Sequence, residues 1–568
     1  MGVKSRMLQW QKSPFDSDTQ KQVAKLYKFP EKAEDAFYKD LEFGTGGMRG
    51  IMGVGTNRIN KYTLGKNTQG LSNYLLEQYK NEKVSVVIAF DCRHQSKYLA
   101  KVCADIFTAN NIKCYLFSDL RPTPELSFAV RYLNAQCGIV LTASHNPPEY
   151  NGYKVYGKDG GQLVPPHDEE VCQKINKTPF QSIKFKGNPD LLYYIDKEID
   201  LAYQKDVLNS ALFDNSNNKQ LKIVFSPIHG TSITALPQVL EQAGYKKVSI
   251  VKDQIEPNGD FPTVVSPNPE EKESLKMAVR LATEKQADIV IGTDPDADRF
   301  ALVVKDQKSN WYYLNGNQTM VVLTEFLLQK RSIQKKIYKN CFVASTIVSS
   351  PLIQKIAMHY DVGYKSTLTG FKWIAKLIED FPDLEFIGGG EESFGFLIGD
   401  SVRDKDAISA SLLACEIANE ALKNGSSFFE LLIKCYKKYG LYKEKLISIT
   451  KKGRSGSEFI AEQMETLRDN PPKTIGGSSV IILEDYLKLT AYNFHLKEEK
   501  SLQYSPSNVL IFKLEDGSKI ALRPSGTEPK IKYYFSVNRK FDSKLSWNDQ
   551  EKFLEKRLKQ LSSAILAQ

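Results

Sequence analysis

The sequence predicts an α/β protein of several domains that ends in a domain of a different, α+β kind. Its recurring unit is a short apolar run, then a polar or glycine-rich loop, then a helical pattern. Residues 84–90, VSVVIAF, lead in this way into Asp91-Cys92-Arg93-His94. Uninterrupted apolar runs are typical of strands buried on both faces, and alternation of strands with helices favours parallel or mixed sheets. Functional side chains are then expected on the loops at the strand ends.

Four further runs follow the same rule. They are GIVLT before Ala143-Ser144-His145-Asn146, LKIVF before Ser226-Pro227-Ile228-His229-Gly230, ADIVIGT before Asp294, and LEFIGG before Gly390-Glu391-Glu392-Ser393. Helical patterns lie between them, for example at residues 236–243 and 408–422, where apolar positions recur with the helical period. The spacing of these units predicts three successive α/β domains with mixed sheets.

The domain boundaries are predicted near residues 205, 312 and 440, within the usual range of roughly 100–200 residues a domain. Residues 1–205, 206–312 and 313–440 form the three α/β domains, and residues 441–568 form the α+β domain. In the last block, residues 507–525 predict two strands joined at Asp516-Gly517, a strong hairpin signal. A long amphipathic helix is predicted to close the chain.

The composition indicates a globular protein, with 41% hydrophobic and 25% charged residues. The 77 basic and 67 acidic residues give a formal net charge of +10. The basic residues are scattered and accompany no nucleic-acid-binding motif, so a solvated lysine-rich surface is favoured over a nucleic-acid partner. A mild positive balance also suits steering of small anionic substrates.

The eight cysteines form no C-x-x-C pair, and several lie in apolar runs as buried free thiols do. This favours a reducing cytoplasm over a disulfide scaffold or a zinc site. The segment MGVKSRMLQWQKS has no apolar core of a signal peptide, and Arg6 stands where myristoylation needs Ser or Thr. No apolar run approaches the roughly 20 residues of a membrane span. We therefore expect a cytoplasmic protein without a membrane contact.

The first chemical motif is Thr142-Ala143-Ser144-His145-Asn146-Pro147-Pro148. A serine at a strand end before a proline-rich turn is expected to be exposed and rigidly held. Its hydroxyl is a weak nucleophile unless a base or a metal assists. No G-x-S-x-G elbow surrounds Ser144, which argues against a hydrolase. On this motif alone, an ordinary turn serine remains an open alternative.

The second motif is the run DPDADR at residues 294–299. Carboxylates at alternate positions point to one side of an extended loop, where they repel one another and need a cation. Hard oxygen ligands suit Mg²⁺ or Ca²⁺. An EF-hand would need Gly and Glu where Arg299 and Lys305 stand. The run predicts a magnesium site with room for a phosphate oxygen and water, and a solvated acidic turn is the alternative.

Three further runs combine glycines with charged residues. Arg523-Pro524-Ser525-Gly526-Thr527-Glu528-Pro529-Lys530 offers a guanidinium fork, hydroxyls and backbone N–H groups, which together suit a phosphate. The glycines of residues 388–395, GGGEESFG, allow close approach of a ligand, and the carboxylates would accept hydrogen bonds from its hydroxyl groups. Residues 44–50, GTGGMRG, present Arg49 to an anion. Plain turns with solvated side chains remain the alternatives for each run taken alone.

In this order, the motifs resemble those of the α-D-phosphohexomutase superfamily, from Gly44 to Tyr534. Residues 41–58 and Thr367-Leu368-Thr369-Gly370-Phe371-Lys372 resemble its long phosphoglucomutase and phosphopentomutase branch. The resemblance implies four domains around a central cleft. They would carry, in chain order, a phosphoserine loop, a metal-binding loop, a sugar-binding loop and a phosphate-binding loop. It also implies interconversion of glucose 1-phosphate and glucose 6-phosphate through a phosphoserine enzyme and a bisphosphorylated sugar.

The resemblance implies a role for each site residue. The residues expected at the transferring phosphate are Ser144, Arg49, His145, Lys154 and Arg299. One Mg²⁺ per chain is expected on Ser144, Asp294, Asp296 and Asp298, with a sugar bisphosphate as intermediate and activator. The residues expected to bind substrate are Thr369, Glu391, Ser393, Lys405, Arg523, Ser525, Gly526 and Thr527. In the run containing Lys405, Asp406 is also expected to cap the helix from Ala407, so both interpretations of that run stay open.

Several alternatives remain within and outside this class. The same-class alternatives are a phosphopentomutase, a phosphomannomutase and a glucose 1,6-bisphosphate synthase. Phe394-Gly395 follows Ser393 where the dual-specificity mutases have Gly-His, a departure that disfavours mannose phosphates. A non-catalytic metal-binding protein on a mutase scaffold is the different-class alternative. Small-molecule sugar phosphates are the expected partners, and the chain is expected to be a monomer or a homodimer.

Overall fold

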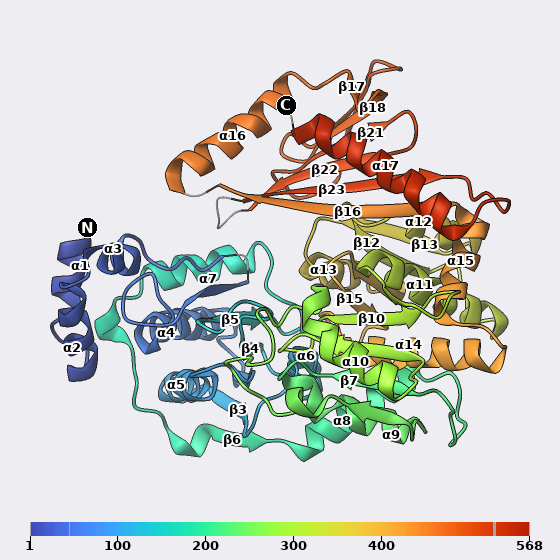
Figure 1. The fold of residues 1–568 in the computed structure, drawn as a ribbon. Helices are drawn as coiled ribbons and strands as arrows, with labels where there is room; N and C mark the ends of the chain where they lie inside the picture. The colour runs from blue at the N-terminus through green and yellow to red at the C-terminus, as the bar shows by residue number, and fades with distance from the viewer. Residues whose placement is uncertain (1, 45, 452, 526–529, 567–568) are drawn as a thin grey trace. The chain divides into compact units, whose positions relative to one another are not determined.

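The computed structural model describes the chain except residues 1, 45, 452, 526–529 and 567–568 (Figure 1). The chain separates into two compact units. The first comprises Met1–Thr319 and Phe371–Phe429, and the second comprises Met320–Gly370 and Glu430–Gln568.

The first unit begins with a layer of three short helices. They are α1 (Val3–Trp10), α2 (Ser17–Leu26) and α3 (Pro30–Phe37). Their apolar faces meet around Trp10, whose ring stacks on Phe15 at 4.4 Å between centroids and meets the edge of Phe37. Tyr62, near the start of α4 (Lys61–Gln78), completes this cluster. Aromatic packing of this kind ties the layer to the sheet that follows.

A six-stranded mixed sheet forms the core of the N-terminal part, with the strand order β1-β5-β4-β2-β3-β6. Strands β2, β3, β4 and β6 run parallel, whereas β5 is antiparallel to both of its neighbours. Its strands are β1 (Gly47–Ile51), β2 (Ser85–Phe90), β3 (Lys113–Phe117), β4 (Cys137–Leu141), β5 (Tyr150–Tyr156) and β6 (Leu192–Ile195).

Helices cover both faces of this sheet because its strands are apolar on both faces. The remaining helices are α5 (Ser96–Ala109), α6 (Thr123–Tyr132), α7 (His167–Asn176) and α8 (Lys197–Ala211). Val86 and Ile88 of β2 pack in one cluster with Leu71 of α4 and Phe107 of α5. On the opposite face, Gly138 leaves room for Val130 of α6, whose methyl group would lie 2.4 Å from an added Cβ.

The second sheet of this unit has the order β11-β10-β9-β7-β8. Its strands are β7 (Ile223–Ser226), β8 (Val248–Ile250), β9 (Ile289–Thr293), β10 (Phe300–Lys305) and β11 (Trp311–Tyr313), with helices α9 (Leu236–Gln242) and α10 (Lys276–Glu284). Strand β7 is parallel to β8 and β9, whereas β10 is antiparallel to β9. The acidic run 294–299 therefore fills the connection between two antiparallel neighbours.

A further segment of the first unit carries a strand pair between two helices. Strands β14 (Glu385–Glu391) and β15 (Gly395–Ile398) are antiparallel, and helices α13 (Lys372–Asp380) and α14 (Ala407–Lys423) flank them in sequence. Asp406 caps α14 by accepting hydrogen bonds from the backbone of Ile408 and Ser409, as the sequence predicted.

The second unit combines a parallel pair with a large antiparallel sheet. Strands β12 (Cys341–Thr346) and β13 (Gly363–Thr367) are parallel, and α12 (Leu352–His359) connects them. Helices α11 (Gly316–Ile333) and α15 (Phe428–Tyr439) each contain one of the sequence boundaries between the units.

The C-terminal sheet has the order β16-β23-β22-β21-β18-β19-β20, with β17 beside β18, and all of its pairs are antiparallel. Gly517, at φ +79°, turns the chain between β21 and β22, which confirms the predicted hairpin. Its strands are β16 (Leu441–Thr450), β17 (Thr474–Ile475), β18 (Ser478–Asp485), β19 (Thr490–Asn493), β20 (Glu498–Ser501), β21 (Leu510–Leu514), β22 (Lys519–Pro524) and β23 (Lys530–Arg539).

Helices α16 (Gly453–Asp469) and α17 (Trp547–Leu566) both contact β23 and appear in orange and red in Figure 1. Helix α17 buries Leu554, Leu558, Leu561 and Ile565, the spacing of the predicted amphipathic helix. The mixed sheets and this antiparallel domain confirm the predicted fold class. The boundaries at 205, 312 and 440 and the central cleft stay predictions. Among the described residues, no helix is both long and apolar enough to cross a bilayer.

We expect one buried ion pair to set much of the stability of the first unit. Lys219 and Glu416 are almost fully buried and paired, and Tyr245 also donates to Glu416 at 2.6 Å. Glu416→Ala would leave the Lys219 ammonium buried without a counter-charge, at a cost of about 3–5 kcal/mol in unfolding free energy. Chemical denaturation measures this loss. Lys423→Ala removes a half-exposed ion pair to Asp214 nearby and is the control, with an expected loss below about 1 kcal/mol. Equal losses in the two variants would contradict the prediction.

Candidate active site

Ser144 lies just beyond β4 in a left-handed backbone conformation, with φ +49°. Its N–H donates to Thr142 Oγ1 at 2.8 Å, and its hydroxyl donates to Asp294 Oδ2 at 2.6 Å. His145 Nδ1 is 3.1 Å from the same hydroxyl oxygen. The sequence predicted an exposed serine, and this was wrong. Ser144 is only 4% exposed, because the acidic run of the neighbouring sheet lies directly over it.

Arg93 holds the Ser144 loop in place, a role that the sequence reasoning missed. Its guanidinium group is buried, pairs with Asp91 and lies 5.0 Å from the ring centroid of Phe261. It donates to four backbone carbonyls of the loop, those of Ser144, Asn146, Pro147 and Tyr150. The five donors of a guanidinium group suit such a cluster of acceptors. Nothing in the local pattern Asp91-Cys92-Arg93 indicates which loop it would meet.

The acidic run forms a tight turn rather than the extended loop that the sequence predicted. Ala297 donates from its backbone to the Asp294 carbonyl at 3.0 Å and has φ +56°. The turn brings the three carboxylates together, with one oxygen of each within 4.8 Å of the others, and all three are buried. The three carboxylates therefore converge because the backbone turns, and not because side chains alternate along an extended strand.

Three separate segments hold this turn. Thr231 donates from its backbone to the Pro295 carbonyl at 2.8 Å, and a Cβ on Gly230 would lie 2.5 Å from Pro295 Cα. Thr123, at the start of α6, makes two hydrogen bonds to Asp296. Its N–H donates to the Asp296 carbonyl at 2.9 Å, and its hydroxyl donates to Asp296 Oδ2 at 3.0 Å. Ala407 donates to the Ala297 carbonyl at 3.2 Å. The role of Thr123 was also missed by the sequence reasoning.

Three cations surround the carboxylates. Lys154 Nζ lies 2.7 Å from Asp296 Oδ2 and 3.1 Å from Asp298 Oδ2, and Lys405 Nζ lies 3.2 Å from Asp298 Oδ2. Burial alone would raise the pKa of Asp298, but Lys154, Lys405 and Arg299 hold it well below its usual value. Burial lowers the pKa of Lys154 less than the facing carboxylates raise it. The lysines therefore stay charged.

The acidic turn could hold a metal ion, because two of its carboxylate oxygens have no hydrogen-bond donor. Asp296 Oδ1 and Asp298 Oδ1 are buried and accept no hydrogen bond from the described residues. A buried acceptor without a partner is costly, and a cation would satisfy it. Burial and the two neighbouring aspartates raise the pKa of Asp294 well above its usual value. Oxygen-only ligands of this kind fit a hard divalent cation.

The glycine-rich run 388–395 lies close to the same cluster. Glu391 ends β14, is buried, and has Oε1 3.9 Å from Lys405 Nζ. Burial raises the pKa of Glu391, and Lys405 partly offsets this effect. The Phe394 carbonyl accepts from Phe300 N at 3.0 Å, which ties the run to β10, and Ser393 is half-buried beside it. Lys405 therefore lies in the cluster while Asp406 caps α14, so the cap is confirmed and substrate binding by Lys405 stays a prediction.

Arg49 is anchored to the Ser144 loop through Asn146, to whose Oδ1 it donates at 2.8 Å. Its strand β1 pairs with β5, the strand of Lys154. The first unit thus brings together all the residues expected at the transferring phosphate, the three aspartates, and Glu391 and Lys405.

Ser393 also lies in the first unit, whereas Thr369, Arg523 and Ser525 lie in the second. Thr369 Oγ1 is buried without a hydrogen-bond partner among the described residues. Arg523 lies opposite Lys532 near the end of β22, and Ser525 N donates to the Lys530 carbonyl at 2.7 Å across the base of the loop. Gly526 and Thr527 lie outside the described residues.

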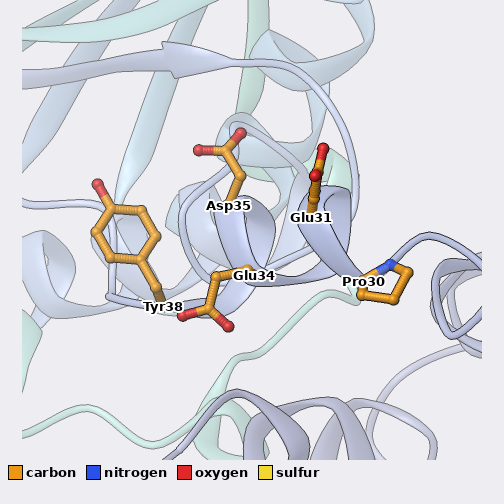
Figure 2. Close-up of a pocket in the computed structure, with 5 residues that line it drawn as sticks. All are labelled: Pro30, Glu31, Glu34, Asp35 and Tyr38. Carbon is orange, nitrogen blue, oxygen red and sulfur yellow. The ribbon is translucent and has the colours of Figure 1, made fainter. Parts of the chain in front are cut away.

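A surface hollow of about 570 Å³ lies elsewhere, on α3 (Figure 2). Pro30, Glu31, Glu34, Asp35 and Tyr38 line it. Three carboxylates would repel a phosphate group, and none of the expected site residues lines this hollow. It is therefore not the site of an anionic sugar phosphate.

The three α/β parts of the chain each match a domain of one protein family. Residues 40–182, 201–308 and 315–439 match the phosphoglucomutase/phosphomannomutase alpha/beta/alpha domains I, II and III. A phosphoglucomutase of Staphylococcus haemolyticus is 38% identical over 518 residues, which cover 89% of this chain and 92% of that protein. The chain belongs to the phosphoglucomutase/phosphomannomutase family. This finding confirms the resemblance drawn from the motifs.

Solved structures of the family share the fold. A phosphoglucomutase/phosphomannomutase family protein from Burkholderia thailandensis, 16% identical, covers 92% of this chain and 97% of its own with a TM-score of 0.65. Parafusin from Paramecium is an exocytosis-sensitive phosphoprotein described as a phosphoglucomutase. It is 18% identical, and the match covers 92% of this chain and 95% of parafusin with a TM-score of 0.67. At these identities the likeness concerns the fold alone.

We expect the acidic turn to bind a divalent cation in solution. Asp296→Asn should weaken Mg²⁺ or Mn²⁺ binding by on the order of 100-fold, because it removes a charged ligand and not merely a supporting contact. Titration calorimetry on the metal-free protein measures this change. Glu284→Gln, on the exposed face of α10, is the matched control and should bind as the wild type does. Unchanged affinity in Asp296→Asn would mean that the turn is not the metal site.

Proposed function

We propose that this chain interconverts glucose 1-phosphate and glucose 6-phosphate through a phosphorylated Ser144. One observation carries the proposal: the Ser144 hydroxyl lies 2.6 Å from Asp294 Oδ2, at the edge of a buried turn of three carboxylates. A serine in such a place is poorly suited to attack a carbonyl but well suited to carry a phosphoryl group beside a cation. The phosphoglucomutase name of a relative 38% identical supports glucose phosphates as substrates.

Each half-reaction transfers one phosphoryl group. The phosphorus–Oγ bond of phosphorylated Ser144 breaks, and a bond forms between phosphorus and a hydroxyl oxygen of the sugar monophosphate. The proton lost by the sugar hydroxyl balances the one that Oγ gains, and His145, with Nδ1 3.1 Å from Oγ, is placed to exchange it. The sugar bisphosphate then turns around and returns its other phosphate to Oγ by the reverse step.

The charged residues around Ser144 have separate tasks in this scheme. Asp294, Asp296 and Asp298 would hold Mg²⁺, one per chain with a Ser144 oxygen as a further ligand. The bound ion would offset negative charge on the phosphoryl oxygens. Lys154 and Arg299 lie beside the aspartates and would meet the same oxygens, and Arg49 reaches the Ser144 loop from β1. Fixed cations in a buried site stabilise developing charge without reorganising.

The remaining residues would bind the sugar and the phosphate that does not react. Glu391 would accept hydrogen bonds from sugar hydroxyls and Ser393 would accept or donate them, and Lys405 and Thr369 are proposed as further substrate-binding residues. Arg523, Ser525, Gly526 and Thr527 would hold the passive phosphate, with the arginine offering its bidentate fork. This arrangement needs the four domains to surround one cleft, which the family resemblance implies.

We propose the cytoplasm as the compartment, because none of the eight cysteines forms a disulfide among the described residues and six are buried. Sugar phosphates are the proposed partners, the sugar bisphosphate the proposed activator, and a monomer or homodimer the proposed state.

A substrate panel tests the function. The purified protein, primed with glucose 1,6-bisphosphate and Mg²⁺, should convert glucose 1-phosphate with a kcat/KM at least about 10-fold above that for mannose 1-phosphate or ribose 1-phosphate. A discrimination of this size requires only one or two differing contacts. A preference for ribose or mannose phosphate would replace the proposed substrate, and net formation of bisphosphate would indicate a synthase. Binding of metal without any turnover would leave a non-catalytic scaffold.

Ser144→Ala should abolish the phosphoryl carrier. Turnover of glucose 1-phosphate should fall by roughly 10³-fold or more, as when a covalent nucleophile is removed. Intact-protein mass spectrometry after incubation with glucose 1,6-bisphosphate should show one added phosphate on the wild type and none on the variant. Ser182→Ala, a turn serine away from the site, is the control. Near-normal turnover by Ser144→Ala would rule out the phosphoserine.

A further inference from the structure

The guanidinium group of Arg299 lies between two carboxylates that compete for it. Its Nη1 donates to Glu270 Oε1 at 2.7 Å, whereas its Nε is 3.7 Å from Asp298 Oδ1 and is buried without a hydrogen-bond partner among the described residues. The Arg299 N–H is already bound to Asp294 Oδ1 at 3.0 Å, so the backbone is fixed. Only the side chain of Arg299 can therefore reorient between Glu270 and Asp298.

Glu270 comes from a long loop that is anchored at several points. All of residues 255–271 are described, and none lies in a helix or strand. Phe261 of this loop packs under Arg93, and Thr263 Oγ1 is 2.9 Å from His229 Nε2. Long ordered loops without regular structure are often functional. Here one loop contacts both the arginine that holds the Ser144 loop and the turn that supports Pro295.

The backbone at Glu270 is itself constrained. Its N–H donates to Asn268 Oδ1 at 3.1 Å, and Ser274 Oγ donates to the Asn268 carbonyl at 2.8 Å. The Glu270 side chain is three-quarters buried. A carboxylate on a fixed backbone, largely removed from water, orients a guanidinium group far better than an exposed one does.

We infer that Glu270 is a positioning residue for Arg299: it draws the guanidinium group away from Asp298 and fixes its free donors toward the phosphoryl group on Ser144. This inference rests on the proposed function. Without Glu270, Asp298 is the remaining carboxylate within 4 Å of the guanidinium group among the described ion pairs. The guanidinium group would then turn onto Asp298, away from the phosphoryl oxygens. Misplacement of a catalytic cation by about 1 Å is enough to cost on the order of 100-fold in rate.

A double-mutant cycle tests the inference on the full chain with Mg²⁺. Glu270→Ala should lower kcat by roughly 10- to 100-fold with KM changed less than about threefold, since the lost contact acts on the transferring phosphate. Glu270→Gln keeps a hydrogen-bond acceptor and should recover most of this loss. In an Arg299→Ala background, Glu270→Ala should cost at most about twofold more, because the residue that it positions is gone.

Glu271→Ala is the matched control. Glu271 is the exposed neighbour, and its carboxylate accepts from Ser266 Oγ at 3.0 Å, so kcat should stay within about twofold of the wild type. Three outcomes would overturn the inference: additive losses in the cycle, equal losses in Glu270→Ala and Glu271→Ala, or a Glu270→Ala variant with unchanged kcat. The cycle is run with both glucose 1-phosphate and ribose 1-phosphate. A wild type active only on ribose 1-phosphate refutes the proposed substrate while the cycle still decides the role of Glu270.

Discussion

The site depends on one constraint: three aspartate carboxylates are buried together in one turn. Two unit charges 4 Å apart interact by about 4 kcal/mol at an effective dielectric constant of 20, and burial costs several kcal/mol more for each ion. Such a cluster persists only if cations reach it. Lys154 from β5, Lys405 from the loop before α14, and Arg299 at the end of the turn supply them. Ion pairs to the aspartates thus connect parts of the first unit that are distant in sequence.

Backbone strain marks the same place. Ser144, Ala297 and Phe394, none of them glycine, have φ values of +49°, +56° and +63°. A left-handed conformation costs an ordinary residue roughly 1–2 kcal/mol, so each must be held by its surroundings. The guanidinium group of Arg93 holds the Ser144 loop, the Asp294 carbonyl holds Ala297, and the N–H of Phe300 holds Phe394. Each of these residues lies in a loop that presents a charged or nucleophilic side chain to the cluster.

The sequence predicted the pieces of the site better than their assembly. Short apolar runs ending in Ser144, Asp294 and Glu391 are local patterns, and a strand end can be recognised from its own residues. The burial of Ser144 could not be predicted in this way, because it comes from a turn 150 residues further along the chain. Arg93, Thr123 and Glu270 were missed for the same reason. Each stands in an unremarkable local pattern, and its role arises only from contacts with loops that are distant in sequence.

The charges within the first unit also suggest an order of events at the site. Three aspartates, Glu391 and Glu270 face Lys154, Lys405 and Arg299, so carboxyl groups outnumber the cations that pair with them. A phosphate dianion would meet repulsion there. A divalent cation on the aspartates would bring the balance closer to neutral, and Arg49, which reaches the Ser144 loop from β1, would add a further positive charge for an arriving phosphate. If Ser144 carries the phosphoryl group as proposed, metal binding should therefore precede its stable phosphorylation.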